Sequence, residues 1–120
     1  MREERLRATA GLRSLPALSS WRGRSGRRYI VGVHPLVASE VMDVTDAVIL
    51  AVKRGPNGLS SVVDMTIVGP QSPDDIRIRW LARAETLGAT EMHVHRLADD
   101  DRERRAVIAD LDQGDAQAAC

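Results

Sequence analysis

The stretch AVILAVKRGPNGLSSVVDMTIV, residues 47–68, decides the fold because it reads as two strands joined by a tight turn. Residues 47–52 are apolar on both faces, which is typical of a central strand that is covered on both sides. The turn signal is GPNG at 55–58, since Asn-Gly accepts the positive φ that tight hairpins need. We therefore predict an antiparallel hairpin whose second strand runs from about residue 59 to 68.

The segments around this hairpin supply one further strand before it and a helix–strand–helix unit after it. Residues 29–34 are rich in β-formers and end at Pro35. Residues 37–46 read as either a loop or one turn of helix. After Gly69-Pro70, the apolar residues recur at helical spacing up to Gly88, which is placed for a C-cap. Residues 90–97 return as a strand, and a last helix follows the acidic run at 99–101.

The order β-β-β-α-β-α predicts an α+β fold in a single small domain over residues 27–113. We expect one sheet with the antiparallel hairpin at its centre and the two helices on one face. Residues 1–26 are interrupted by Gly, Pro and Ser, so we predict a basic, flexible N-terminal arm. Residues 114–120 are predicted to be a disordered tail that holds the single cysteine, Cys120.

Charge is sorted along the chain although the formal net charge is zero. Residues 1–28 hold eight arginines and two glutamates, 8 − 2 = +6, so the remaining residues 29–120 carry −6. Sixteen of the seventeen basic residues are Arg, a bias that a GC-rich bacterial genome also produces. The densest basic cluster is WRGRSGRR at 21–28, which suits an acidic protein surface or phosphate backbones. An arm folded back on the acidic domain, or a solvated terminus, would also account for the segregation.

Composition excludes several classes of protein. Three aromatic residues and no Phe make base-stacking platforms scarce. A lone cysteine excludes an internal disulfide and a Cys-rich zinc module. No apolar run approaches the roughly 18 residues of a membrane span, and the N-terminus lacks the apolar segment of a secretory signal. We therefore expect a cytoplasmic protein with no membrane span and no cofactor.

The segment EMHVH, residues 91–95, carries the candidate chemistry. On a strand, Glu91, His93 and His95 share one face, about 6.6–6.8 Å apart in steps of two residues. With His34 they would supply the three or four ligands of a catalytic metal, provided that the strand at 29–34 lies beside this one with His34 on the same face. The competing interpretation is the solvated side of a half-buried strand, because Met92 and Val94 point the other way.

The leading hypothesis is a small non-enzymatic accessory subunit that binds a larger protein or protein complex. It would use its arm and the exposed sheet face, with the partner-binding residues Trp21, Arg22, Arg24, Arg27 and Arg28. One alternative is a nucleic-acid-binding module with the same arm on the phosphates. Another is a small metal-dependent hydrolase that uses Glu91, His93, His95 and His34. A homodimer could cover the open sheet face.

Overall fold

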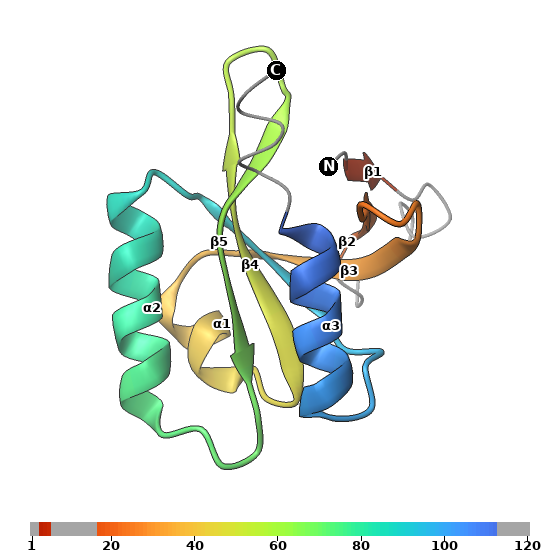
Figure 1. Ribbon diagram of the computed structural model, residues 1–120. Helices are drawn as coiled ribbons and strands as arrows, with labels where there is room; N and C mark the ends of the chain where they lie inside the picture. The colour runs from red at the N-terminus through yellow and green to blue at the C-terminus, as the bar shows by residue number, and fades with distance from the viewer. Residues whose placement is uncertain (1–2, 6–16, 113–120) are drawn as a thin grey trace.

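The computed structural model describes residues 3–5 and 17–112 of the 120-residue chain. Within these residues, six strands form one antiparallel sheet in the order β1-β2-β3-β6-β4-β5, and three helices pack against it (Figure 1). The strands are β1 (Glu3–Arg5), β2 (Ala17–Arg22), β3 (Arg28–Pro35), β4 (Ala47–Arg54), β5 (Ser60–Val68) and β6 (Glu91–His95). The helices are α1 (Ala38–Asp43), α2 (Asp74–Thr86) and α3 (Asp101–Leu111). The α+β class is confirmed.

The hairpin of β4 and β5 is confirmed, and the apolar run at 47–52 is buried at every position between β6 and β5. Gly58 closes the turn with φ +81°, a conformation that suits glycine. The pairing contains a bulge: Ala51 lies opposite Asp64 and Val52 opposite Val62, so Val63 is an extra residue in β5. The bulge reverses the alternation of side chains, and Val63 consequently packs on the opposite face from Met65.

Two cores lie on the two faces of β4. One contains Ile49 together with residues of α1 and α2, and the other contains Leu50 together with residues of α3. The predicted placement of the helices on one face is therefore wrong, because α3 covers the face opposite to α1 and α2 (Figure 1). A strand that is apolar on both sides needs a cover on each. The 3.6-residue period of a helix shows that it packs on a sheet but not on which face.

Residues 17–26 belong to the folded domain, which corrects the prediction of a flexible arm for this stretch. Strand β2 pairs with β3 over its whole length, with Trp21 opposite Tyr29, and both side chains are buried in the α3-side core. Strand β1 adds Glu3 opposite Trp21. The Gly and Ser residues of this stretch occupy a short strand and a tight turn. Residues 6–16 and the predicted tail at 114–120, with Cys120, lie outside the described residues.

Among the described residues, no helix combines the length and the apolar character needed to cross a bilayer.

Replacement of Ile49 by Ala tests the two-sided burial of β4. Ile49 is fully buried, so Ile49→Ala should lower the free energy of unfolding by about 2–5 kcal/mol, because it removes apolar contacts and leaves a cavity. Ile78 on α2 is exposed, and Ile78→Ala should change the same quantity by less than about 0.5 kcal/mol. Chemical denaturation of both variants gives the comparison, and equal losses would show that β4 is not buried as described.

Candidate functional site

The side chains of Glu91, His93 and His95 share the α3 side of β6, as the strand period predicts, but this side is not solvated. His93 is 0% exposed and His95 is 5% exposed. Met92 and Val94 enter the core on the α1/α2 side. The interpretation of this face as a wet, polar surface is therefore wrong, since Trp21 of β2 and helix α3 cover it. The sheet face that the leading hypothesis expects to be exposed for partner binding is likewise covered at β4 and β6.

His34 does not join the other two histidines. Strand β3 does pair with β6, as the metal hypothesis requires, but its register sets His34 opposite Met92 and Val33 opposite His93. Residues directly opposite each other share a face, so His34 lies on the α1/α2 side, where its Nδ1 is 3.4 Å from Glu40. The four-residue metal site is contradicted by a register difference of one residue.

His93 is held by a hydrogen bond from the other end of the chain. The indole Nε1–H of Trp21 donates to His93 Nδ1 at 2.9 Å, and both side chains are fully buried. An Nδ1 that accepts a hydrogen bond carries no proton, so the Nε2 carries it and donates to Glu91 Oε1 at 2.9 Å. The contact thus defines one neutral tautomer of His93 and ties β2 to β6.

Arg54, at the end of β4, neutralises the Glu91 carboxylate. Its Nε and Nη2 donate to the two oxygens of Glu91 at 2.9 and 2.8 Å, a bidentate pair. Hydrogen bonding and attraction from Arg54 bring the pKa of Glu91 from 4.5 to about 2. The pKa of Arg54 is raised above its ordinary value, mainly by its hydrogen bond with Glu91. Both groups are therefore charged at neutral pH.

Glu3 of β1 is the second acidic member of this network. Its Oε1 accepts from Arg54 Nη2 at 3.1 Å and from the Ser60 hydroxyl at 3.0 Å. Burial raises the pKa of Glu3, but the nearby Ser19 side chain, the Ser60 hydrogen bond and the Arg54 charge outweigh this effect, so the pKa lies below its ordinary value of 4.5. The network of Glu3, Arg54, Glu91, His93 and Trp21 therefore joins β1, β2, β4 and β6.

The ligand atoms of Glu3, Glu91 and His93 lie within 4.8 Å of one another, close enough for a metal ion. In this arrangement, however, the Arg54 guanidinium occupies the position next to both carboxylates that a cation would take. His93 uses Nδ1 for Trp21 and Nε2 for Glu91. The geometry is that of a partly buried ion-pair network, and this network fixes the strands and one histidine tautomer.

A second anchor holds the hairpin between β2 and β3 against α3. The Asp110 carboxylate accepts from the Ser25 amide at 2.8 Å, the Ser25 hydroxyl at 2.7 Å and the Tyr29 hydroxyl at 2.7 Å. The Arg24 amide donates to the Asp110 carbonyl at 2.9 Å. Burial and Asp110 together raise the pKa of Tyr29 to about 12, so its hydroxyl remains a donor. A Cβ at Gly23 would collide with this carboxylate, which explains glycine there.

The arginines of this hairpin are exposed although its backbone is docked. Arg22 and Arg28 lie directly opposite each other in the β2–β3 ladder, on the face away from Trp21 and Tyr29. Arg24 lies in the turn between them. We call Arg22, Arg24 and Arg28 the basic patch. Arg27 points to the other side of β3, with its Cζ 5.8 Å from the centre of the Tyr29 ring.

Of the five predicted partner-binding residues, the four arginines are therefore on the surface and Trp21 is in the core. Sequence reasoning missed Glu3, Arg54, Tyr29 and Asp110, which hold the site together. No short motif links these residues, because the contacts between Glu3 and Arg54 and between Tyr29 and Asp110 span 51 and 81 positions of the chain.

Comparison with known proteins finds no matching family model, no matching curated protein and no matching solved structure.

Replacement of Trp21 by Phe tests the hydrogen bond to His93. Trp21→Phe removes the donor and leaves His93 Nδ1 buried without it, which should cost about 1–3 kcal/mol of unfolding free energy beyond the loss of volume. Trp80→Phe is the matched control, because Trp80 is also buried but its Nε1 has no hydrogen-bond partner among the described residues. Equal losses of unfolding free energy in the two variants, measured by urea denaturation, would contradict the hydrogen bond between Trp21 and His93.

The pH dependence of stability tests the Glu91–Arg54 pair. Because the folded-state pKa of Glu91 lies near 2, below 4.5, its contribution to stability is complete above about pH 4.5 and is lost as the pH falls towards 2. The difference in unfolding free energy between the unmodified protein and Glu91→Gln should therefore be constant near neutral pH and shrink in acid. Glu85→Gln, at an exposed position of α2, should show no such change. If the difference in unfolding free energy between the unmodified protein and Glu91→Gln grew in acid, it would contradict the ion pair between Glu91 and Arg54.

Proposed function

We propose that this protein is a small non-enzymatic interaction module that binds an acidic surface of a larger protein through its basic patch. The observation that carries the proposal is the register of the hairpin, which sets Arg22 directly opposite Arg28. Two guanidinium groups at facing positions concentrate positive charge, which an acidic partner surface would complement.

The docked turn supports binding because it holds the patch in place before a partner arrives. The Arg24 and Ser25 backbones are bonded to Asp110, so ordering of the loop costs little on association. The Arg side chains supply planar donors that pair with carboxylates in a bidentate way.

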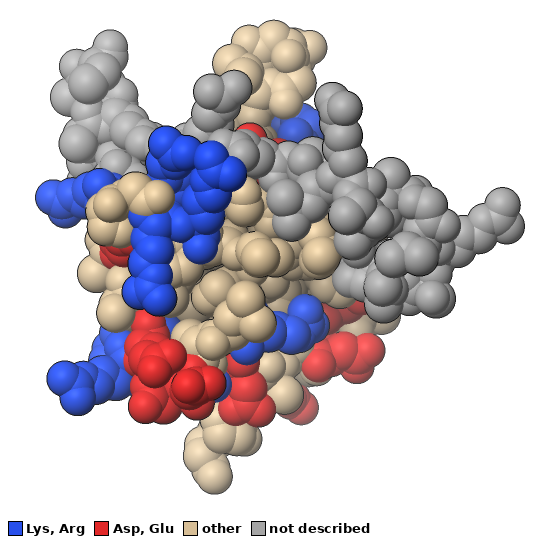
Figure 2. Space-filling model, turned by 90° about the vertical axis from the view of Figure 1, so that its right-hand side faces the viewer, with Lys and Arg blue, Asp and Glu red and all other residues tan. Residues whose placement is uncertain are grey.

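The charge around the patch favours a protein over a nucleic acid. Figure 2 shows Lys and Arg side chains over the upper part of one face and a group of Asp and Glu side chains below them. A phosphate backbone would be repelled by such a neighbouring acidic group, whereas a protein surface can match both signs. The chain's three aromatic residues, Trp21, Tyr29 and Trp80, are all buried, so they offer bases no stacking surface.

The experiment is affinity purification of the tagged full-length chain from its native cell, with protein and nucleic acid quantified after nuclease treatment. The double variant Arg22→Gln/Arg24→Gln should reduce a specific protein partner's recovery by about tenfold, because it removes two charges from the interface. The control Arg102→Gln/Arg105→Gln removes the same charge from exposed positions of α3 and should leave recovery unchanged.

Three results would refute the proposal. One is equal recovery with both double variants, which would show that the basic patch is not used. Another is a partner that nuclease releases, since the patch would then bind nucleic acid. The third is a patch variant that binds normally in a purified two-component assay with the recovered protein.

A further inference from the structure

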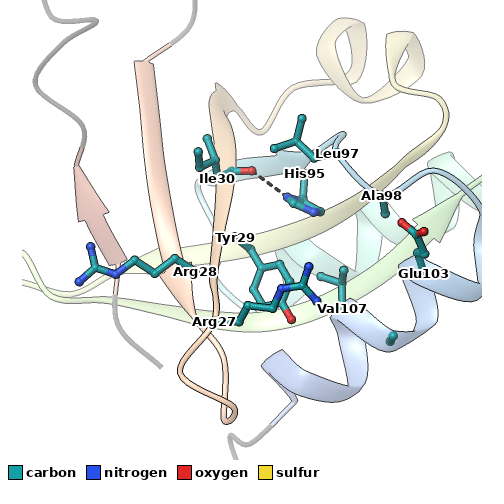
Figure 3. Close-up of a pocket in the computed structure, with 10 residues that line it drawn as sticks. Arg27, Arg28, Tyr29, Ile30, His95, Leu97, Ala98, Glu103 and Val107 are labelled. Atoms are coloured by element: carbon teal, nitrogen blue, oxygen red, sulfur yellow. Dashed lines mark hydrogen bonds between the residues drawn. The ribbon is translucent and has the colours of Figure 1, made fainter.

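A pocket of about 390 Å³ opens between β3, the end of β6 and α3, and both Arg27 and Arg28 line it (Figure 3). Its volume is within the range of small-molecule sites, roughly 300–1,000 Å³. Figure 3 shows Arg27 directed towards α3 and Arg28 directed away from it. The pocket therefore adjoins the basic patch at Arg28, whereas Arg22 and Arg24 are not among its lining residues.

His95 supplies a fixed hydrogen-bond acceptor in this pocket. Its Nδ1–H donates to the Ile30 carbonyl at 2.8 Å, so Nε2 carries the lone pair. Figure 3 shows this second nitrogen on the edge of the ring away from Ile30, and within the described residues no hydrogen bond is made to it. The ring is 5% exposed and packs edge-on against Tyr29 at 5.5 Å between centroids. Burial lowers its pKa, so the acceptor is retained at neutral pH.

Besides Arg28, two residues of opposite charge, Arg27 and Glu103, line the pocket. Arg27 lies over the Tyr29 ring on one side. Glu103 of α3 lies on the other, where one of its oxygens, Oε2, accepts from the Asp99 amide at 3.0 Å, which holds the carboxylate in place and leaves Oε1 for a ligand. An anion without a positive group would meet repulsion from Glu103, and a simple amine would meet repulsion from Arg27.

The rest of the lining is apolar and partly open to water. It consists of Ile30, Leu97, Ala98, Ala106 and Val107. Leu97 is 68% exposed and Ile30 is 42% exposed, so a ligand with an apolar group would cover surface that is now hydrated.

From these three features we infer that the pocket binds a free α-amino acid with an apolar side chain. Arg27 pairs with the carboxylate, Glu103 and the Nε2 of His95 accept from the ammonium group, and the side chain lies against Leu97 and Val107. The two charged ends of the ligand match the opposite charges of Arg27 and Glu103. This binding activity is additional to the partner binding proposed above and uses a different set of residues.

The test is an NMR titration of the isotope-labelled full-length protein with L-leucine. Saturable shifts are expected at the pocket residues. N-acetyl-L-leucine, which lacks the ammonium charge, and L-leucinamide, which lacks the carboxylate, should each bind at least about tenfold more weakly, since each loses one charge-assisted contact. Glycine, which lacks the apolar side chain, should also bind more weakly. The absence of saturable shifts with L-leucine, or equal binding of either analogue, would overturn the inference.

Variants assign the contacts to residues. Arg27→Gln and Glu103→Gln should each weaken L-leucine binding by about tenfold or more, while Arg22→Gln, at the basic patch, should leave it unchanged. Spectra that match the unmodified protein outside the pocket confirm that each variant is folded. Unchanged affinity in both pocket variants would refute the site. Because Arg22→Gln/Arg24→Gln affects the protein partner and not leucine, failure of either proposal can be told apart from failure of the other.

Discussion

The hydrogen bond from the Trp21 indole to His93 Nδ1 is the contact on which the arrangement of this protein depends. It brings β2 against the α3 side of the sheet and requires His93 to be neutral, with its Nε2–H donating to the Glu91 carboxylate. Glu91 is in turn held by Arg54, which also bonds Glu3. A buried polar group is costly unless it is bonded, and this chain of contacts satisfies both nitrogens of His93. The burial of a histidine-bearing strand is possible for this reason.

Because β2 is fixed, the turn between β2 and β3 has little conformational freedom. The hydrogen bonds to Asp110 restrict it further. The two sides of this hairpin then differ. Arg22, Arg24 and Arg28 form a cationic surface on one side, and Arg27, together with Arg28, lines a pocket beside α3. The basic cluster at 21–28, most of which the sequence assigns to a flexible arm, is thus a fixed part of the folded domain. Both proposed binding activities depend on this fixed position.

The elements with strong local signals could be predicted, and the contacts between distant elements could not. Residues 47–68 contain both strands and their turn, so the hairpin was accessible from local chemistry. The amphipathic period of α3 indicates a packed helix but not which face of the sheet it covers. The metal hypothesis failed at His34 because a register between strands about sixty residues apart is set by the whole fold. Trp21 was misassigned because its partner, His93, is 72 positions away.

Hydrogen exchange of the Arg24 and Ser25 backbone amides is the most direct measurement of whether the basic hairpin is part of the folded domain. In the unmodified protein both amides should be protected, because each donates to Asp110. In Asp110→Ala the Ser25 amide loses the carboxylate acceptor and should exchange rapidly, while the amides of β4 stay protected. Rapid exchange of both hairpin amides in the unmodified protein, at the rate of an unstructured peptide, would contradict this account.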